Sequence, residues 1–309
     1  MNILIVRPGA IGDTLLTLPV IQALRERYAP SSITLVGNEA VLPLARACSI
    51  VDEVYDYQET RWSYLFLTPS SRPARDMGLE AIMKRTQLAI CWLRDPDGVV
   101  ERNLRAAGIQ QVIVVSGRPD PLAPEKLHVI AYLAKTVGLT WQQPLDDVSL
   151  PMPVIAQQED SPRPVALHPG SGGARKCWPV EHFAETIYYL WQRHRATVLV
   201  LAGPAEHERL AQLRSLLHAY PQSGQCIYLV NTPLLTVAQR LQQCQCYIGN
   251  DSGLTHLAGM LGLPTLALFG PSDPQIWHPP GRAVTVLHKQ ALEQLDVETV
   301  ITKLAALQQ

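Results

Sequence analysis

Short runs of β-forming residues alternate with longer amphipathic stretches along the chain, and this series occurs twice. Strands separated by helix-length crossovers pair in parallel, so the alternation restricts the chain to α/β folds. Predicted strands cover residues 3–7, 33–37, 54–57, 87–93 and 111–116, then 165–168, 197–202, 226–230, 247–249 and 265–269. Predicted helices cover residues 13–28, 39–47, 98–107 and 125–137, then 180–194, 206–219, 234–244 and 253–261. The sequence therefore predicts two parallel sheets.

A proline-rich segment separates the two series. Residues 140–164 contain five prolines, which lack the backbone N–H that a regular helix needs: Pro144, Pro151, Pro153, Pro162 and Pro164. A chain of 309 residues also suits two domains of about 150 residues each. We therefore expect an N-terminal domain over 1–150, a linker over 151–164 and a C-terminal domain over 165–309.

Composition and charge exclude several classes of protein. The net charge of −1 gives no overall attraction to nucleic acid. The first apolar run is four residues long and ends at Arg7, too short for a signal peptide. The weakly polar stretch 253–271 is interrupted by Thr255, His256 and Pro264, so it does not predict a membrane span. The six cysteines lack zinc-site spacing, so we expect reduced thiols in a cytoplasmic protein.

Each series opens with a strand followed by a glycine-rich turn, 8–12 in the first and 169–173 in the second. Ligands of parallel sheets bind at the carboxyl ends of the strands, where these turns lie. Neither turn has the G-x-G-x-x-G pattern or P-loop spacing. In the second turn, backbone N–H groups, the Ser171 hydroxyl and the Lys176 charge would suit an anion. The alternative is an ordinary glycine-rich loop with a solvated lysine.

The segment 249–256, Gly-Asn-Asp-Ser-Gly-Leu-Thr-His, connects a predicted strand to a predicted helix. The first N–H groups of a helix lack internal acceptors and carry partial positive charge, so a diphosphate fits there. The alternative is purely structural: Asp251 or Ser252 caps the helix, and His256 is a buried core histidine.

Two further acidic features have a catalytic and a structural interpretation. Asp13 begins the first helix, where it can act as a general base or as a helix cap. The helix N-terminus lowers the basicity of a carboxylate, whereas desolvation raises it. Asp95-Pro96-Asp97 matches the D-x-D pattern that holds a divalent metal, but it is also typical of a turn. We expect the turn, and no metal site.

Three segments resemble the signatures of a known family. They are R-P-G-A-I-G-D-T-L-L-T-L-P (7–19), H-P-G-S-G-G-A-R-K-C-W-P (168–179) and G-N-D-S-G-L-T-H-L-A-G-M-L-G-L-P-T-L-A-L-F-G-P (249–271). Together they resemble glycosyltransferase family 9, the ADP-heptose:lipopolysaccharide heptosyltransferase family. The resemblance implies a GT-B architecture, in which two Rossmann-like domains face each other across a cleft. The N-terminal domain would bind the acceptor and the C-terminal domain the nucleotide sugar.

The resemblance also implies roles for single residues. Asp13 matches the catalytic base, and Lys176 matches a donor-binding lysine that we also count as catalytic. Glu206 matches the ribose-binding acid, and Asp251 the carboxylate that holds the donor sugar. The remaining donor-binding candidates match the phosphate loop and the helix start: Ser171, Gly172, Ser252, Gly253, Leu254, Thr255 and His256.

The acceptor side is less closely matched to the family. Pro8-Gly9-Ala10 stands where relatives usually carry small hydroxyl residues. Residues 60–94 contain six basic and two acidic side chains, which would attract an anionic glycan or form a solvated surface. The acceptor-side candidates are Gly12, Arg61, Arg72 and Arg75.

The implied function is inverting transfer of a heptose from ADP-heptose to a hydroxyl of a lipopolysaccharide-core-like or other glycan, without metal or cofactor. The partners would be a nucleoside-diphosphate sugar and a lipid-linked or oligosaccharide acceptor, with no nucleic acid. The enzyme would lie in the cytoplasm, free or peripherally bound to the inner membrane. The alternatives are a non-catalytic nucleotide-sugar-binding protein and a family 9 relative that uses another donor sugar. The acceptor, nucleobase and oligomeric state stay open.

Overall fold

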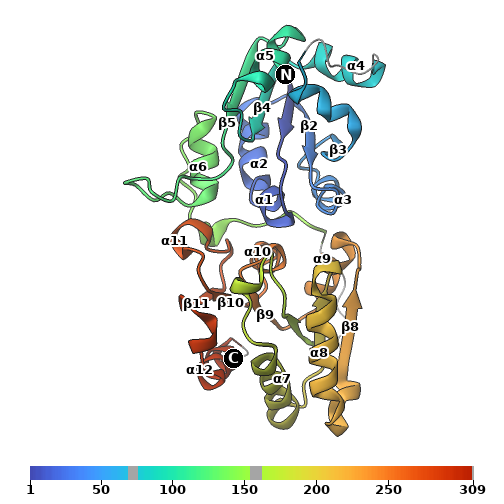
Figure 1. The fold of residues 1–309 in the computed structure, drawn as a ribbon, viewed down its shortest axis with the longest axis vertical. Helices are drawn as coiled ribbons and strands as arrows, with labels where there is room; N and C mark the ends of the chain where they lie inside the picture. Colours follow the sequence, from blue (N-terminus) through green and yellow to red (C-terminus); the bar gives the residue numbers. More distant parts are fainter. Residues whose placement is uncertain (69–75, 154–161, 308–309) are drawn as a thin grey trace. The chain divides into compact units, whose positions relative to one another are not determined.

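The computed structural model describes residues 1–68, 76–153 and 162–307. The chain divides into two compact units, Met1–Gln142 and Gln143–Gln309. Each unit contains one parallel sheet with helices packed on it (Figure 1). The predicted α/β class with two parallel sheets is therefore confirmed. The segment predicted as a linker, 151–164, belongs to the second compact unit. Its residues 154–161 lie outside the described residues.

The sheet of the first unit has the strand order β3-β2-β1-β4-β5. Its strands are β1 (Asn2–Val6), β2 (Ser32–Gly37), β3 (Glu53–Asp56), β4 (Leu88–Trp92) and β5 (Gln111–Val115). In the centre, Ile3 of β1 pairs with Ile33 on one side and with Leu88 on the other. The central strands are apolar on both faces because helices cover both sides of the sheet.

The helices of the first unit differ from the prediction in two places. They are α1 (Ile11–Leu15), α2 (Leu18–Arg27), α3 (Leu42–Ala47), α4 (Met77–Arg85), α5 (Val99–Ala106) and α6 (Val129–Thr136). The single helix predicted over 13–28 is wrong, because a new helix begins at Leu18 with Pro19 in its first turn, and the Thr17 hydroxyl donates to the Asp13 carbonyl. Helix α4 was not predicted, although its N-cap Asp76 accepts from the Leu79 N–H.

The sheet of the second unit has the strand order β11-β10-β9-β6-β7-β8. Its strands are β6 (Val165–His168), β7 (Val198–Ala202), β8 (Cys226–Val230), β9 (Cys246–Asn250), β10 (Thr265–Phe269) and β11 (Val284–His288). The edge strand β11 was not predicted; it is half-buried and shows little alternation in burial. The other five agree with the predicted strands to within a residue or two.

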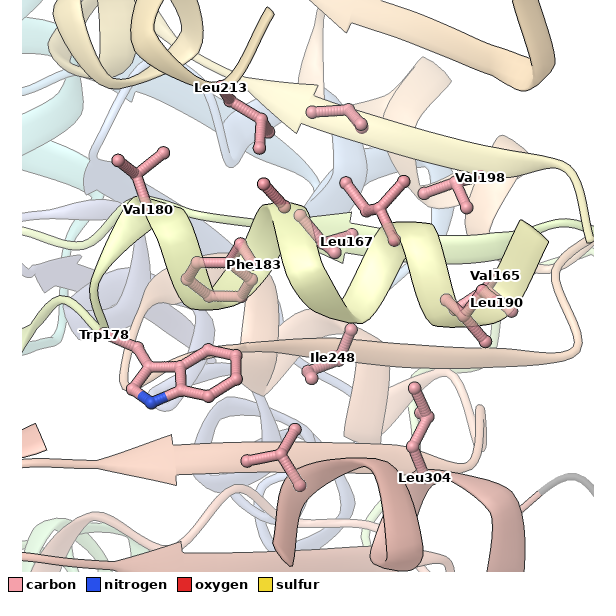
Figure 2. Close-up of a cluster of buried hydrophobic side chains, with 14 of the residues drawn as sticks. Val165, Leu167, Trp178, Val180, Phe183, Leu190, Val198, Leu213, Ile248 and Leu304 are labelled. Carbon is pink, nitrogen blue, oxygen red and sulfur yellow. The ribbon is translucent and has the colours of Figure 1, made fainter. Parts of the chain in front are cut away.

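Helices of the second unit bury one broad apolar core against this sheet. They are α7 (Val180–His194), α8 (His207–His218), α9 (Leu234–Leu241), α10 (Gly253–Met260), α11 (Pro274–Trp277) and α12 (Val297–Ala306). Figure 2 shows Phe183 and Leu190 of α7 near Leu167 and Ile248 of the sheet, with Trp178 just before the helix. The Trp178 indole N–H donates to the Leu295 carbonyl at 2.9 Å, so this large ring is buried with its polar atom satisfied.

Two expectations concern the chain as a whole. In the described parts of the chain, no helix combines the length and apolar character needed to cross a membrane. None of the six cysteines, all of which lie within the described residues, forms a disulfide, and five of them are buried.

Candidate functional site

Each sheet has a point at which the strand order reverses, and ligands of such sheets bind in the crevice at the carboxyl ends of the strands there. In the first unit this point lies between β1 and β4, and in the second between β6 and β9. The residues singled out in the sequence follow these strands.

In the first unit, Asp13 lies at the N-terminal turn of α1 and is 7% exposed. Its Oδ1 lies 3.0 Å from Arg7 Nη2, and its Oδ2 accepts from the Ala10 N–H at 3.0 Å and from Arg118 Nη2 at 3.1 Å. The helix-capping role is therefore real, and it coexists with two ion pairs. An ionised carboxylate has about four acceptor positions, so these three contacts leave room for one further hydrogen bond, such as that of an attacking hydroxyl.

Arg7 is a buried partner that holds the Asp13 carboxylate in place. It is 3% exposed, and its guanidinium also donates to the carbonyls of Asp13, Trp92 and Gly117 at 3.2, 3.3 and 2.9 Å. Burial lowers the pKa of Arg7, and the neighbouring Asp13 carboxylate opposes that effect. The buried arginine thus connects the ends of β1, β4 and the segment after β5, and holds Asp13 in one orientation.

Arg118 differs from Arg7 because its side chain is 67% exposed. It reaches Asp13 across 105 residues of sequence from the segment after β5. An exposed guanidinium beside a buried carboxylate can move toward a negatively charged ligand with little loss of packing.

In the second unit, Asn250 at the end of β9 organises the glycine-rich turn. Its amide donates to the carbonyls of Pro169 and Gly170 at 3.0 and 3.1 Å, and its Oδ1 accepts from the Trp178 N–H at 2.9 Å. Arg209 of α8 also donates to the Pro169 carbonyl, at 3.0 Å. These hydrogen bonds hold Pro169 and Gly170 at the start of the turn, and Trp178 after it, against the end of β9 and α8, unlike the residues of a freely solvated loop.

The second unit also brings Lys176 and Asp251 together. Lys176 Nζ lies 2.8 Å from Asp251 Oδ2, and His256 Nε2 lies 3.6 Å from Asp251 Oδ1. Burial alone would raise the pKa of Asp251, but His256 and Lys176 outweigh burial and hold that pKa well below its usual range. Asp251 is thus an ionised, buried carboxylate, while Lys176 is 40% exposed and accessible to a ligand.

Helix α10 begins directly after this carboxylate. Ser252 is its N-cap, and the Ser252 hydroxyl accepts from the Thr255 N–H at 3.4 Å. The N–H groups of Gly253 and Leu254, at the start of the helix, have no acceptor within the helix because of helix geometry. Ser171 donates its hydroxyl to the Asp251 carbonyl at 2.5 Å, which ties the glycine-rich turn to this helix start. Backbone N–H groups and a lysine therefore meet here, as an anion site requires.

Glu206 lies on the other side of the turn, at the end of the short 3-10 helix Pro204–Glu206. Its Oε2 accepts from the Gly203 N–H at 2.7 Å and lies 3.9 Å from His168 Nε2. The contact with His168 is the main cause that lowers the pKa of Glu206, and burial opposes it. This second acid is also ionised and nearly buried.

The Pro-Gly pair that opens both turns has the same steric function in each unit. A Cβ on Gly9, whose φ is +138°, would lie 2.6 Å from Asp13 Oδ2, and a Cβ on Gly170 would lie 2.5 Å from Glu206 Cδ. Glycine is therefore needed in both turns because an acidic side chain packs directly against its Cα.

A comparison with known families identifies the chain. Residues 128–304, more than half of the chain, match the model of glycosyltransferase family 9 (heptosyltransferase). The chain belongs to glycosyltransferase family 9.

Individual relatives extend the similarity to the first unit. This family 9 glycosyltransferase is 24% identical to lipopolysaccharide heptosyltransferase 1 of Escherichia coli K12, over 99% of this chain and 100% of the relative. It is 24% identical to lipopolysaccharide heptosyltransferase 2 of the same strain, over 90% of this chain and 85% of the relative. The solved structure of E. coli ADP-heptose LPS heptosyltransferase II has the same fold, with a TM-score of 0.76 at 23% identity, covering 100% of this chain and 98% of that one.

The acceptor-side candidates of this family 9 enzyme are only partly described. Gly12 lies in α1 next to Asp13. Arg61 Nε lies 2.9 Å from Glu59 Oε2 and 3.7 Å from Asp76 Oδ2, so its charge is shared with two carboxylates. Arg72 and Arg75 lie outside the described residues.

The D-x-D pattern forms a turn, as expected. The Gly98 N–H donates to the Asp95 carbonyl at 3.1 Å, Gly98 has a φ of +65°, and the Asp95 carboxylate accepts from the Glu101 N–H. The pair therefore starts helix α5. Within residues 1–68, 76–153 and 162–307, no three His, Cys, Asp or Glu side chains cluster as metal ligands.

Replacing Gly170 tests the packing of Glu206. We expect Gly170→Ala to lower the free energy of unfolding by about 1–3 kcal/mol, since the added methyl group overlaps the Glu206 side chain. Gly173→Ala is the matched control, because a Cβ there has no neighbour within 4 Å. Urea unfolding of both variants measures the difference. Equal stabilities would show that Glu206 does not pack as described.

The ionisation of Glu206 predicts a pH dependence. A carboxylate whose pKa is lowered on folding adds stability that is fully present above its unfolded value of 4.5 and is lost as the pH falls through the lower folded value. We therefore expect the difference in unfolding free energy between wild type and Glu206→Gln to shrink as the pH falls below 4.5. Urea titrations at each pH measure it, and a difference that stays constant down to pH 3 would contradict the assignment.

Four residues that organise these groups were not predicted from the sequence: Arg7, Arg118, His168 and Asn250. Arg7 carried a usable signal, because it ends a buried strand where a charged residue needs a partner. Arg118 carried none, since its partner lies 105 residues away. His168 and Asn250 lie inside the signature segments, but the sequence alone does not show what they contact.

Proposed function

We propose that this glycosyltransferase transfers a heptose from ADP-heptose to a hydroxyl of a lipopolysaccharide-core-like glycan or a related acceptor, with inversion at the anomeric carbon. The names of the relatives support heptose as the sugar and lipopolysaccharide as the acceptor class. The observation that carries the proposal is the convergence of Lys176, Asp251 and the α10 N-terminus in the second unit.

The second unit is proposed to bind the donor. Lys176 and the N–H groups of Gly253 and Leu254 would contact the diphosphate, and Asp251 would accept hydrogen bonds from the sugar hydroxyls. Glu206 would accept from the ribose hydroxyls, for which its lowered pKa keeps it ionised and accepting. Open space lies beside Gly172, since a Cβ there would meet no atom within 4 Å, so the donor can approach the Gly172 backbone closely.

Charge accumulates on the diphosphate as the bond to the sugar breaks. Groups already aimed at the leaving oxygens stabilise that charge without rearrangement, and here these would be a lysine and helix N–H dipoles. We therefore propose that the reaction needs no metal ion. Transfer rates in EDTA should equal those in magnesium; loss of transfer in EDTA with recovery on adding magnesium would contradict this part of the proposal.

The first unit is proposed to supply the base. Asp13 would accept the proton of the acceptor hydroxyl as that oxygen attacks the anomeric carbon from the face opposite the diphosphate, which gives inversion. The three donors that surround Asp13 hold it in place, and one acceptor position remains for the hydroxyl. The proposal requires Asp13 to reach the bound donor during the reaction, and it includes binding at the inner membrane when the acceptor is lipid-linked.

A donor panel tests the proposal before the acceptor is known. A ligand that binds only the folded protein stabilises it by about 2.7 kcal/mol at 100 times its Kd, so ADP-heptose should raise the melting temperature clearly. UDP- and GDP-sugars should raise it less. A larger shift with another nucleotide sugar would favour the family relative with a different donor, and the absence of any shift would contradict the donor site.

Transfer itself is then measured with lipid-linked and soluble glycan acceptors and ADP-heptose. We expect release of ADP that depends on acceptor, and a product whose anomeric configuration, read by NMR, is opposite to that of the donor. A product with retained configuration would contradict the proposed role of Asp13.

A further inference from the structure

His168 occupies a central position in the second unit that the roles above leave unused. It is the last residue of β6, and β6 lies between β9 and β7 in the sheet. The segment after β9 carries Ser252, and the segment after β7 carries Glu206. The His168 side chain is therefore placed between two residues proposed to contact the same donor molecule. It is 4% exposed, so solvent contributes little to its hydrogen bonding.

The two ring nitrogens of His168 reach these two residues. Nδ1 lies 3.3 Å from the Ser252 hydroxyl, and Nε2 lies 3.9 Å from Glu206 Oε2. The first distance is that of a hydrogen bond, and the second is longer than a hydrogen bond but brings the ring nitrogen close to the carboxylate. One imidazole thus bridges two loops that the sequence separates by more than forty residues.

The neighbouring groups determine which nitrogen carries the proton. An ionised Glu206 favours a proton on Nε2, which leaves the Nδ1 lone pair as an acceptor for the Ser252 hydroxyl. Ser252 already accepts from the Thr255 N–H, so its own proton is available to donate to His168. The Thr255 hydroxyl donates to the Asn250 carbonyl, so it does not compete as a donor to Ser252, although its oxygen at 3.1 Å is a second acceptor for the Ser252 proton beside His168 Nδ1.

We propose that His168 is a positioning residue that joins the Glu206 carboxylate and the Ser252 hydroxyl into one unit for binding a nucleoside diphosphate. The proposal rests on the donor site proposed above, since Glu206 faces the ribose and Ser252 the diphosphate in that assignment. We call Glu206, His168 and Ser252 together the array. Losing the contact at one end of the array should free the imidazole to turn and so weaken the contact at the other end. The two ends should therefore contribute to binding in a coupled way.

Double-mutant cycles with ADP as the ligand test the coupling. Glu206→Gln, Ser252→Ala and the double variant are titrated calorimetrically, first with His168 present and then with His168→Phe. Groups in one network are typically coupled, so with His168 present we expect a coupling factor of at least about threefold in Kd. With His168→Phe the factor should fall to about one. Additive effects with His168 present, or coupling that persists without it, would overturn the proposal.

Conservative replacement separates positioning from packing. The His168→Asn amide lies near the position of Nδ1 and can still contact Ser252, whereas His168→Phe keeps only the buried flat ring. We expect His168→Phe to weaken ADP binding about tenfold or more, and His168→Asn, which keeps the contact to Ser252 but not the one to Glu206, to recover part of the loss. Equal affinities for the two variants would overturn the proposal. If His168→Phe does not fold, the ADP affinity of His168→Asn is compared with that of the wild-type protein.

A measurement without nucleotide keeps this inference separate from the donor assignment. In the full chain labelled with ¹⁵N-histidine, the His168 signals are identified by their absence in His168→Asn. We expect the tautomer with its proton on Nε2, and a shift of the Nδ1 signal in Ser252→Ala. A proton on Nδ1 would overturn the array. Failure of the wild-type protein to bind ADP, with the Nε2–H form present, would overturn the donor assignment and leave the array supported.

Discussion

Asp13→Asn should lower the turnover of sugar transfer by about 10² to 10⁴ while ADP binding stays within twofold of wild type. The amide keeps the size of the side chain but cannot take the acceptor proton. Its effect on donor binding should be small, because every described contact of Asp13 is made within the first unit. Initial rates and calorimetric titration with ADP on the same preparation measure the two effects.

The control for Asp13→Asn must address folding, since the change leaves Arg7 and Arg118 without a full negative charge. Asp97→Asn removes an exposed carboxylate of the same unit and should retain full activity. Melting curves of both variants show whether Asp13→Asn is folded at the assay temperature. A folded Asp13→Asn protein with wild-type turnover would reject Asp13 as the base.

Lys176→Ala should reduce both donor affinity and turnover, with kcat lower by about 10² to 10³. The lysine would contact the diphosphate before and during bond breaking, so its loss affects the bound state and, more strongly, the transition state. It also removes a cation 2.8 Å from the buried Asp251 carboxylate and leaves that acid with the His256 ring, whose Nε2 lies 3.6 Å away. Titration with ADP and initial rates separate the two effects.

Two matched variants sharpen the Lys176 result. Lys303→Ala removes an exposed lysine of the same unit and should change neither affinity nor turnover. Lys176→Arg keeps the positive charge and should recover part of the affinity, though not the geometry of a compact ammonium group. Wild-type ADP affinity in Lys176→Ala would remove this residue from the donor site.

The fold could be predicted from the sequence because its strands are continuous apolar runs between strong turn signals. The central strands β1, β4, β6 and β9 are nearly or wholly buried, and such strands are the easiest to recognise. Edge strand β11 and helix α4 were missed because half-buried elements carry weaker patterns. The division at Pro19 was missed because an apolar periodicity continues through it.

The candidate site was predicted in part, and the limit is physical. Residue types and turn positions single out Asp13, Lys176 and Asp251, because each lies in the segment that follows a central strand. Partners from distant segments cannot be found this way: Arg118 reaches Asp13 from a separate segment after β5, and Asn250 fastens a turn 80 residues earlier in the chain. The Pro-Gly repetition was visible in the sequence, but its cause, an acid packed on each glycine, required coordinates.

The central claim is that a carboxylate of the first unit acts on a donor held by the second. A crystal structure of the protein with a non-hydrolysable ADP-heptose analogue tests it most directly. One acceptor oxygen must fit between the Asp13 carboxylate and the anomeric carbon, so the account predicts a separation of about 6 to 7 Å, on the face of the sugar opposite the diphosphate. An Asp13 carboxylate turned away from the bound sugar, with another acid on that face, would contradict it.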